Sequence, residues 1–113
     1  MFGLGPQSIP GQLVRSFALQ GKIRFTQHAV ERMDERQVEA DAVVCAIASG
    51  REIEVQPATD ADPDIRVLFQ EAGGISFYVV TICRNMTCLV VSVCLTQEES
   101  WEVVQGVLRR RSR

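Results

Sequence analysis

The sequence lacks any long apolar run. No stretch approaches the roughly 18 consecutive apolar residues that a membrane-spanning helix needs. The opening residues 1–11 also lack the basic region followed by an apolar segment that marks a secretory leader. We therefore expect a cytoplasmic protein that does not contact a membrane. In that reducing compartment its four cysteines are expected to remain thiols.

Histidine is scarce, because the chain has only one, His28. Cys83, Cys88 and Cys94 have neither C-x-x-C spacing nor histidine partners, so we expect no zinc site. The aspartate-rich loop 57–64 lacks the glycine and the terminal glutamate of a calcium-binding loop, and we interpret it as a solvated turn. We predict that the protein uses no metal and no cofactor.

Positive charge is scarce outside the C-terminus. The chain has 12 basic and 14 acidic residues, a net charge of −2, and its last residues, 109–113, form a basic tail. The remaining body is acidic, which argues against a broad phosphate-binding surface, since affinity for nucleic acid comes largely from basic side chains. Contact with RNA would have to be local, through clustered arginines or through the tail residues Arg109, Arg110 and Arg111.

The length of 113 residues and the hydrophobic content of 46% predict one domain, residues 1–113. Apolar residues at helical spacing predict three helices in the first half of the chain. The first begins at Ser8 or Ile9 and ends at Gly21, the second has Thr26 as its N-cap, and the third spans Ala40 to Ser49. Residues 22–25 are interpreted as a short link between the first two helices.

After Gly50 the apolar period changes to two, which is typical of strands. We predict strands over 52–56 and 65–70, then a hairpin of "ISFYVVTIC" and "CLVVSVCLT" whose turn at Asn85-Met86 puts Cys83 opposite Cys88. Apolar residues from Trp101 to Leu108 predict a last helix over 97–109. The expected fold is α+β, with N-terminal helices followed by an antiparallel sheet of about four strands and a C-terminal helix.

The segment "FTQHAVERMDERQ" carries the most suggestive polar residues. At about 100° per residue, His28, Arg32 and Arg36 fall on one stripe of a helix. An imidazole can give or take a proton near neutral pH and a guanidinium offers several donors to phosphate oxygens, so the stripe could bind or cleave a phosphodiester. The alternative is that the arginines pair with Glu31, Glu35 or other acids and that the histidine caps a carbonyl.

The longer segment "FTQHAVERMDERQVEADAVVCAIASG" resembles the signature of the domain of unknown function 4258 family, and the resemblance covers residues 23–96. The specific part is the spacing of Thr26, His28, Ala29, Arg32, Met33 and Arg36. That family is grouped with compact ribonuclease-like toxins of the barnase, EndoU, colicin and RelE type. The grouping implies helices followed by a four-stranded antiparallel sheet.

The resemblance implies an endoribonuclease that cleaves RNA without a metal, by attack of a 2'-hydroxyl on the adjacent phosphate. That step needs a proton acceptor, a proton donor and positive charge near the phosphorus. His28 would supply one proton role, and Arg32 and Arg36 would stabilise the developing charge. The residues leave the second proton group open, with four candidates: Tyr78, Glu52, Glu54 and Thr96.

Two other functions stay open. Strand 88–96 is apolar on both faces, so the face left by the helices could bind a protein partner or a second copy, and the protein would then be a non-catalytic interaction module. An RNA-binding protein without chemistry would instead depend on the tail 109–113.

Overall fold

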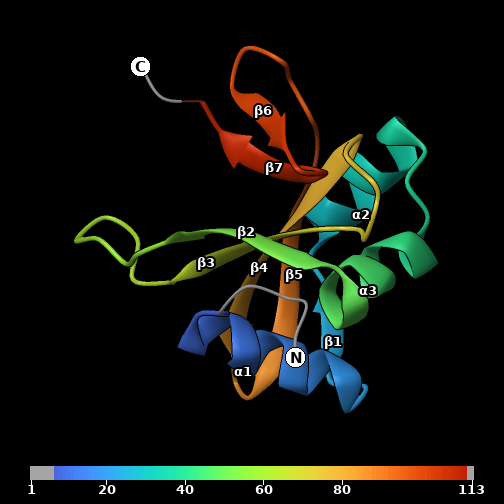
Figure 1. Ribbon diagram of the computed structural model, residues 1–113. Coiled ribbons are helices and arrows are strands. Elements are labelled where there is room, and N and C mark those ends of the chain that lie inside the picture. Colours follow the sequence, from blue (N-terminus) through green and yellow to red (C-terminus); the bar gives the residue numbers. More distant parts are fainter. Residues whose placement is uncertain (1–6, 112–113) are drawn as a thin grey trace.

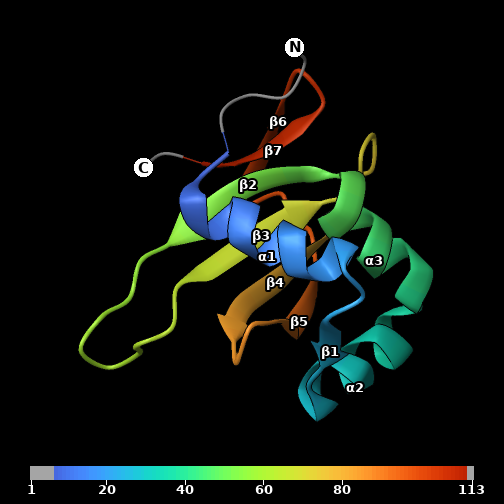
Figure 2. The same ribbon diagram turned by 90° about the horizontal axis from the view of Figure 1, so that it is seen from below.

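The computed structural model describes residues 7–111, shown in Figures 1 and 2. Three helices come first, with one short strand between the first and the second. The helices are α1 (Ile9–Leu19), α2 (Gln27–Arg36) and α3 (Ala40–Ser49). The strands are β1 (Ile23–Phe25), β2 (Arg51–Gln56), β3 (Arg66–Gln70), β4 (Phe77–Arg84), β5 (Thr87–Leu95), β6 (Trp101–Val104) and β7 (Val107–Arg110).

The predicted starts of the helices are confirmed by their caps. The Ser8 side chain accepts a hydrogen bond from the Gly11 amide at the start of α1, and the Thr26 side chain accepts one from the Ala29 amide at the start of α2. Such bonds satisfy amides that have no partner inside the helix. The third helix has the predicted bounds and is followed by Gly50.

The main sheet has five strands in the order β1-β5-β4-β3-β2. The predicted four-stranded antiparallel sheet is wrong, because β1 pairs with β5 in parallel, Arg24 facing Leu89. The prediction of a link over residues 22–25 is wrong for Ile23–Phe25, which form β1. Three residues show no periodicity of their own, and they form a strand because β5 offers them backbone partners far along the chain.

The predicted C-terminal helix is also wrong. Residues 101–110 form the antiparallel hairpin β6–β7, with Val104 opposite Val107. Gln105 and Gly106 have φ values of 54° and 79°, as a two-residue hairpin turn requires. The apolar positions fit a helix and a hairpin equally well, but the β-branched residues on each side of this turn favour strands.

The predicted β4–β5 hairpin is confirmed, with Asn85 and Met86 in the turn and Cys83 opposite Cys88. A bulge lies midway, since Val80 faces Ser92 whereas the next residue, Thr81, faces Val90. Val91 is therefore the extra residue. The bulge keeps Ser92 and Cys94 on the same face as the even-numbered residues of β4.

The two faces of the sheet have different covers (Figures 1 and 2). Helices α1 and α3 pack on the inner face, where the main core includes Val14, Ile47 and Phe69. The β6–β7 hairpin covers part of the outer face, and there Trp101 and Leu108 pack on side chains from β2, β3 and β4. Within residues 7–111, no helix is long and apolar enough to cross a membrane.

Candidate functional site

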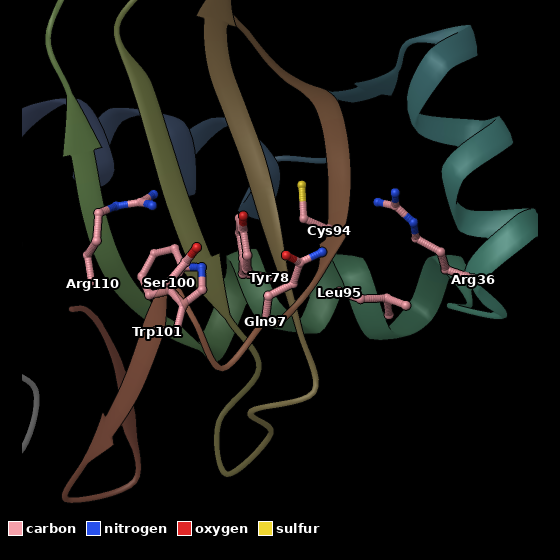
Figure 3. A pocket seen from close by; sticks show the side chains of 8 residues that line it. All are labelled: Arg36, Tyr78, Cys94, Leu95, Gln97, Ser100, Trp101 and Arg110. Atoms are coloured by element: carbon pink, nitrogen blue, oxygen red, sulfur yellow. The ribbon is translucent and has the colours of Figure 1, made fainter.

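A pocket of about 330 Å³ opens on the outer face of the sheet, between the end of α2 and the β6–β7 hairpin (Figure 3). Its floor comes from β4 and β5. It is lined by Arg36, Tyr78, Cys94, Leu95, Gln97, Ser100, Trp101 and Arg110. Residues from four separate parts of the chain therefore meet in one hollow.

Tyr78 and Cys94 form the floor, because they face each other across the β4–β5 ladder and so point to the same side. The Tyr78 ring also packs against Trp101, with ring centroids 4.9 Å apart. Burial, and next the neighbouring Cys94, raise the pKa of the Tyr78 phenol above its usual value. The phenol therefore keeps its proton at neutral pH and can donate it in a hydrogen bond.

Arg36 forms one side of the pocket. It is the last residue of α2, and its Nη1 donates to the Val93 carbonyl oxygen at 2.5 Å. In Figure 3 its guanidinium points from α2 toward Cys94. That bond uses one of the five guanidinium N–H groups, so others can bind a ligand.

Arg110 forms the opposite side. Its Nε and Nη2 donate to the two carboxylate oxygens of Glu54 at 2.7 and 3.0 Å, and its guanidinium lies 4.4 Å from the centre of the Trp101 ring. This two-point bond lowers the pKa of Glu54 and raises that of Arg110. Within residues 7–111, Nη1 of Arg110 has no hydrogen bond, and it can take an anion.

The Glu54–Arg110 pair should make stability depend on pH. Because folding lowers the pKa of Glu54 from its usual 4.5, its contribution is present above that pH and is lost as the pH falls through the lower value of the folded state. Arg110 is 46% exposed, so we expect the Glu54→Gln variant to lose only about 0.5–1 kcal/mol at pH 7. Urea unfolding at pH 7 and pH 3 measures this loss, which should shrink at the lower pH.

The exposed Glu99→Gln is the matched control, since it removes the same charge from a residue that forms no ion pair within residues 7–111. A loss in Glu54→Gln that is as large at pH 3 as at pH 7 would contradict the assignment.

His28 lies beside the pocket rather than in its lining. It is exposed in the first turn of α2, and its Nε2 is 3.5 Å from Ser92 Oγ. Ser92 Oγ is in turn 3.6 Å from Cys94 Sγ. A row of polar side chains thus runs from His28 through Ser92 and Cys94 to Tyr78.

Arg32, which we placed on the same stripe, does not line the pocket. Its guanidinium forms an ion pair with Glu35 on the solvent side of α2. The alternative that the arginines pair with acidic residues thus describes Arg32, whereas Arg36 lines the pocket. The two arginines are only four positions apart on α2, but their surroundings differ because only Arg36 reaches the end of β5.

The arginines at the C-terminus do not form a free tail over residues 109–111. Arg109 and Arg110 belong to β7, and Arg111 donates through Nε to the Glu98 carbonyl oxygen at 2.5 Å. Of these three, the pocket contains only Arg110. The rest of the predicted tail, residues 112–113, lies outside the described residues.

The four candidates for a second proton group are separated by the fold. Tyr78 is in the pocket, and Glu54 is bound to Arg110. Glu52 instead accepts hydrogen bonds from Ser8 at the start of α1. The Thr96 hydroxyl is buried, with no hydrogen-bond partner among residues 7–111.

The predicted catalytic residues did not include Ser92, Cys94 or Trp101. The two on β5 were assigned to an apolar strand, and Trp101 to a helix. The dipeptide Gln105-Gly106 between β-branched residues was the signal that could have identified the hairpin. Nowhere in residues 7–111 do three or more histidine, cysteine or acidic side chains gather in a way that could hold a metal ion.

Comparisons with known proteins give one match, to a family described as Domain of unknown function (DUF4258), over residues 25–95. That span contains α2, α3 and β2 to β5, and therefore the floor of the pocket and Arg36. No curated protein and no solved structure matches the chain. Because the match covers more than half of the 113 residues, the chain belongs to the DUF4258 family.

Proposed function

We propose that this protein is an endoribonuclease that cleaves RNA without a metal ion, with the phosphodiester bound in the pocket between Arg36 and Arg110. The observation that carries the proposal is that two guanidinium groups, from α2 and β7, line opposite sides of one pocket whose floor holds a protonated tyrosine. Cationic groups and hydrogen-bond donors that converge on one hollow suit a phosphate. The sequence resemblance to ribonuclease-like toxins supports the same reaction.

The chemistry assigns a role to each group. His28 accepts the proton of the 2'-hydroxyl, whose oxygen attacks the adjacent phosphorus. The bond from phosphorus to the 5'-oxygen breaks, and Tyr78 gives its proton to that leaving oxygen. Arg36 and Arg110 stabilise the extra negative charge on the phosphate oxygens. The products are a 2',3'-cyclic phosphate and a 5'-hydroxyl.

The acidic net charge of the chain is compatible with this role. A broad basic surface is needed for tight binding along a nucleic acid, but one scissile phosphate needs only a few donors. Arg36 and Arg110 supply those donors locally. We therefore expect weak binding of RNA with a shallow dependence on salt, because few phosphates are neutralised.

Incubation of the purified protein with single-stranded RNA in excess EDTA tests the proposal. We expect cleavage that the chelator does not reduce, with products ending in a 2',3'-cyclic phosphate and a 5'-hydroxyl by mass spectrometry. An oligonucleotide with 2'-deoxy sugars is the control, because it lacks the attacking hydroxyl and should stay intact. Absence of cleavage, or products with a 3'-hydroxyl, would overturn the mechanism.

A non-catalytic interaction module is the second candidate. Four large apolar residues are well exposed around the β6–β7 hairpin and the neighbouring ends of β4 and β5. They are Ile75, Leu95, Val103 and Val104. An apolar surface of this kind suits a protein partner or a second copy. Failure of the cleavage assay would favour this function.

A further inference from the structure

The outer face of the sheet continues beyond the pocket, toward the β4–β5 turn. Side chains alternate along a strand, so Tyr78 and Arg84 share this face of β4. On β5, Leu89 lies opposite Ile82 of β4 and opposite Arg24 of β1, so these residues face the same way. The β6–β7 hairpin covers the Tyr78 end of this face, whereas Arg24 and Arg84 lie exposed at the other end.

A second pocket of about 380 Å³ lies at that exposed end. It is lined by Arg24, Arg84, Asn85, Thr87 and Leu89. Arg84 Nη2 donates to Asp64 at 2.5 Å, and the Arg84 side chain remains 54% exposed. Arg24 forms no ion pair with any other residue between 7 and 111. At least one guanidinium in this pocket is therefore available to an external anion.

We propose that the second pocket is a subsite for a further phosphate of the same RNA strand, so that the substrate lies along β4 and β5 from one pocket to the other. This inference rests on the proposed function. Tyr78 and Arg84 are six positions apart on β4, which is about 20 Å at the usual rise of a strand. A dinucleotide bound in the first pocket cannot reach that far, whereas a longer oligonucleotide can.

The surface between the pockets fits this path. Ile82 and Leu89 lie side by side there. Ile82 is only 2% exposed, so the partly exposed Leu89 is the apolar side chain that a base can reach. Apolar side chains suit the faces of bases, while guanidinium groups suit phosphates. An apolar surface between two cationic pockets thus matches a single strand of RNA, in which bases and phosphates are both accessible. Continuity with the cleavage pocket favours RNA over an acidic protein segment.

The test compares the Arg24→Gln variant with Lys22→Gln. Each variant loses one positive charge, but Lys22 lies toward α1, with Nζ 6.0 Å from the Phe17 ring. Two measurements are made on each protein and on the wild type. One is the affinity for a ten-nucleotide RNA with 2'-O-methyl sugars, which cannot be cut. The other is the rate of cleavage of a dinucleotide.

We expect Arg24→Gln to bind the long strand about three- to tenfold more weakly than the wild type. Its plot of log affinity against log salt should be shallower by about 0.7, the loss of one phosphate contact to single-stranded RNA. Cleavage of the dinucleotide should not change. The Lys22→Gln control should match the wild type in both measurements.

Three results would overturn the subsite. If Arg24→Gln binds the long strand as well as the wild type while the dinucleotide is cut, the subsite fails and the proposed function stands. If the wild type neither cuts the dinucleotide nor binds the long strand, both fail. If poly-glutamate binds as tightly as RNA of equal charge and loses affinity in Arg24→Gln, the surface takes an acidic protein instead.

Discussion

The His28→Ala variant should cleave RNA about 10²- to 10⁴-fold more slowly than the wild-type chain. A positioned imidazole removes the 2'-proton as the phosphorus is attacked, and water cannot replace it at the same place. The side chain is held at the first turn of α2, 3.5 Å from Ser92 Oγ and next to the pocket floor. Because His28 is exposed, its loss should change the free energy of unfolding by less than about 0.5 kcal/mol.

Single-turnover cleavage rates and urea unfolding of the same preparations measure the loss of activity and the change in stability of His28→Ala.

The two arginines of α2 provide a matched pair of further variants. Arg36→Ala removes a group that lines the pocket, and we expect about 10²- to 10³-fold slower cleavage. Arg32→Ala removes the same charge from the solvent side and should cut within a few-fold of the wild type.

A different order among these variants would contradict the assignment. If His28→Ala retains more than a tenth of the wild-type rate, the imidazole is not the proton acceptor. If Arg32→Ala and Arg36→Ala lose activity equally, the effect comes from net charge and not from the pocket.

Local sequence signals predicted the three N-terminal helices well, because each signal corresponds to a local bond. Thr26 caps α2 through its own hydroxyl, and Gly50 follows α3 where a side chain would collide with the Ala46 carbonyl oxygen. The β4–β5 turn is local as well. Such features depend on residues within a few positions of each other, which a sequence displays directly.

The errors lie where distant residues decide the structure. The strand β1 is too short to have a pattern, and it exists because β5 lies beside it. The β6–β7 hairpin has apolar positions that also fit a helix, and it is held by contacts with β2, β3 and β4 that no local pattern shows. Tertiary contacts therefore determined both elements.

Only some residues of the candidate site were predicted from the sequence. Helical spacing identified His28 and Arg36 as candidates. It could not distinguish Arg36 from Arg32, because Arg36 bonds to β5 and Arg32 pairs with Glu35, and the spacing shows neither contact. Arg110 was assigned to a tail because its hairpin was not recognised. The buried glutamine that holds this hairpin, Gln70, was interpreted only as the end of a strand.

Replacement of Gln70 by leucine should release the hairpin that forms one wall of the pocket. Gln70 is fully buried, and its side chain binds the hairpin backbone at two points. Its Oε1 accepts from the Leu108 amide at 2.5 Å, and its Nε2 donates to the Gly106 carbonyl oxygen at 3.0 Å. Leucine has a similar size but leaves the buried amide and the carbonyl without these partners, at about 1–3 kcal/mol each.

We expect Gln70→Leu to lower the free energy of unfolding by about 2–4 kcal/mol, because the extra apolar surface of leucine offsets only part of that cost. Trp101 is the chain's one tryptophan, begins β6 and is only 3% exposed where the hairpin packs on the sheet, so its fluorescence reports the docking. Red-shifted emission in native buffer, with far-ultraviolet circular dichroism close to that of the wild type, would mean that the hairpin leaves while the main sheet persists. Cleavage should then fall as well, since Arg110 belongs to β7.

The matched control is Gln20→Leu, which replaces an exposed glutamine at the end of α1 and should change neither stability nor emission. Wild-type stability and emission in Gln70→Leu would show that the Gln70 hydrogen bonds do not hold the hairpin.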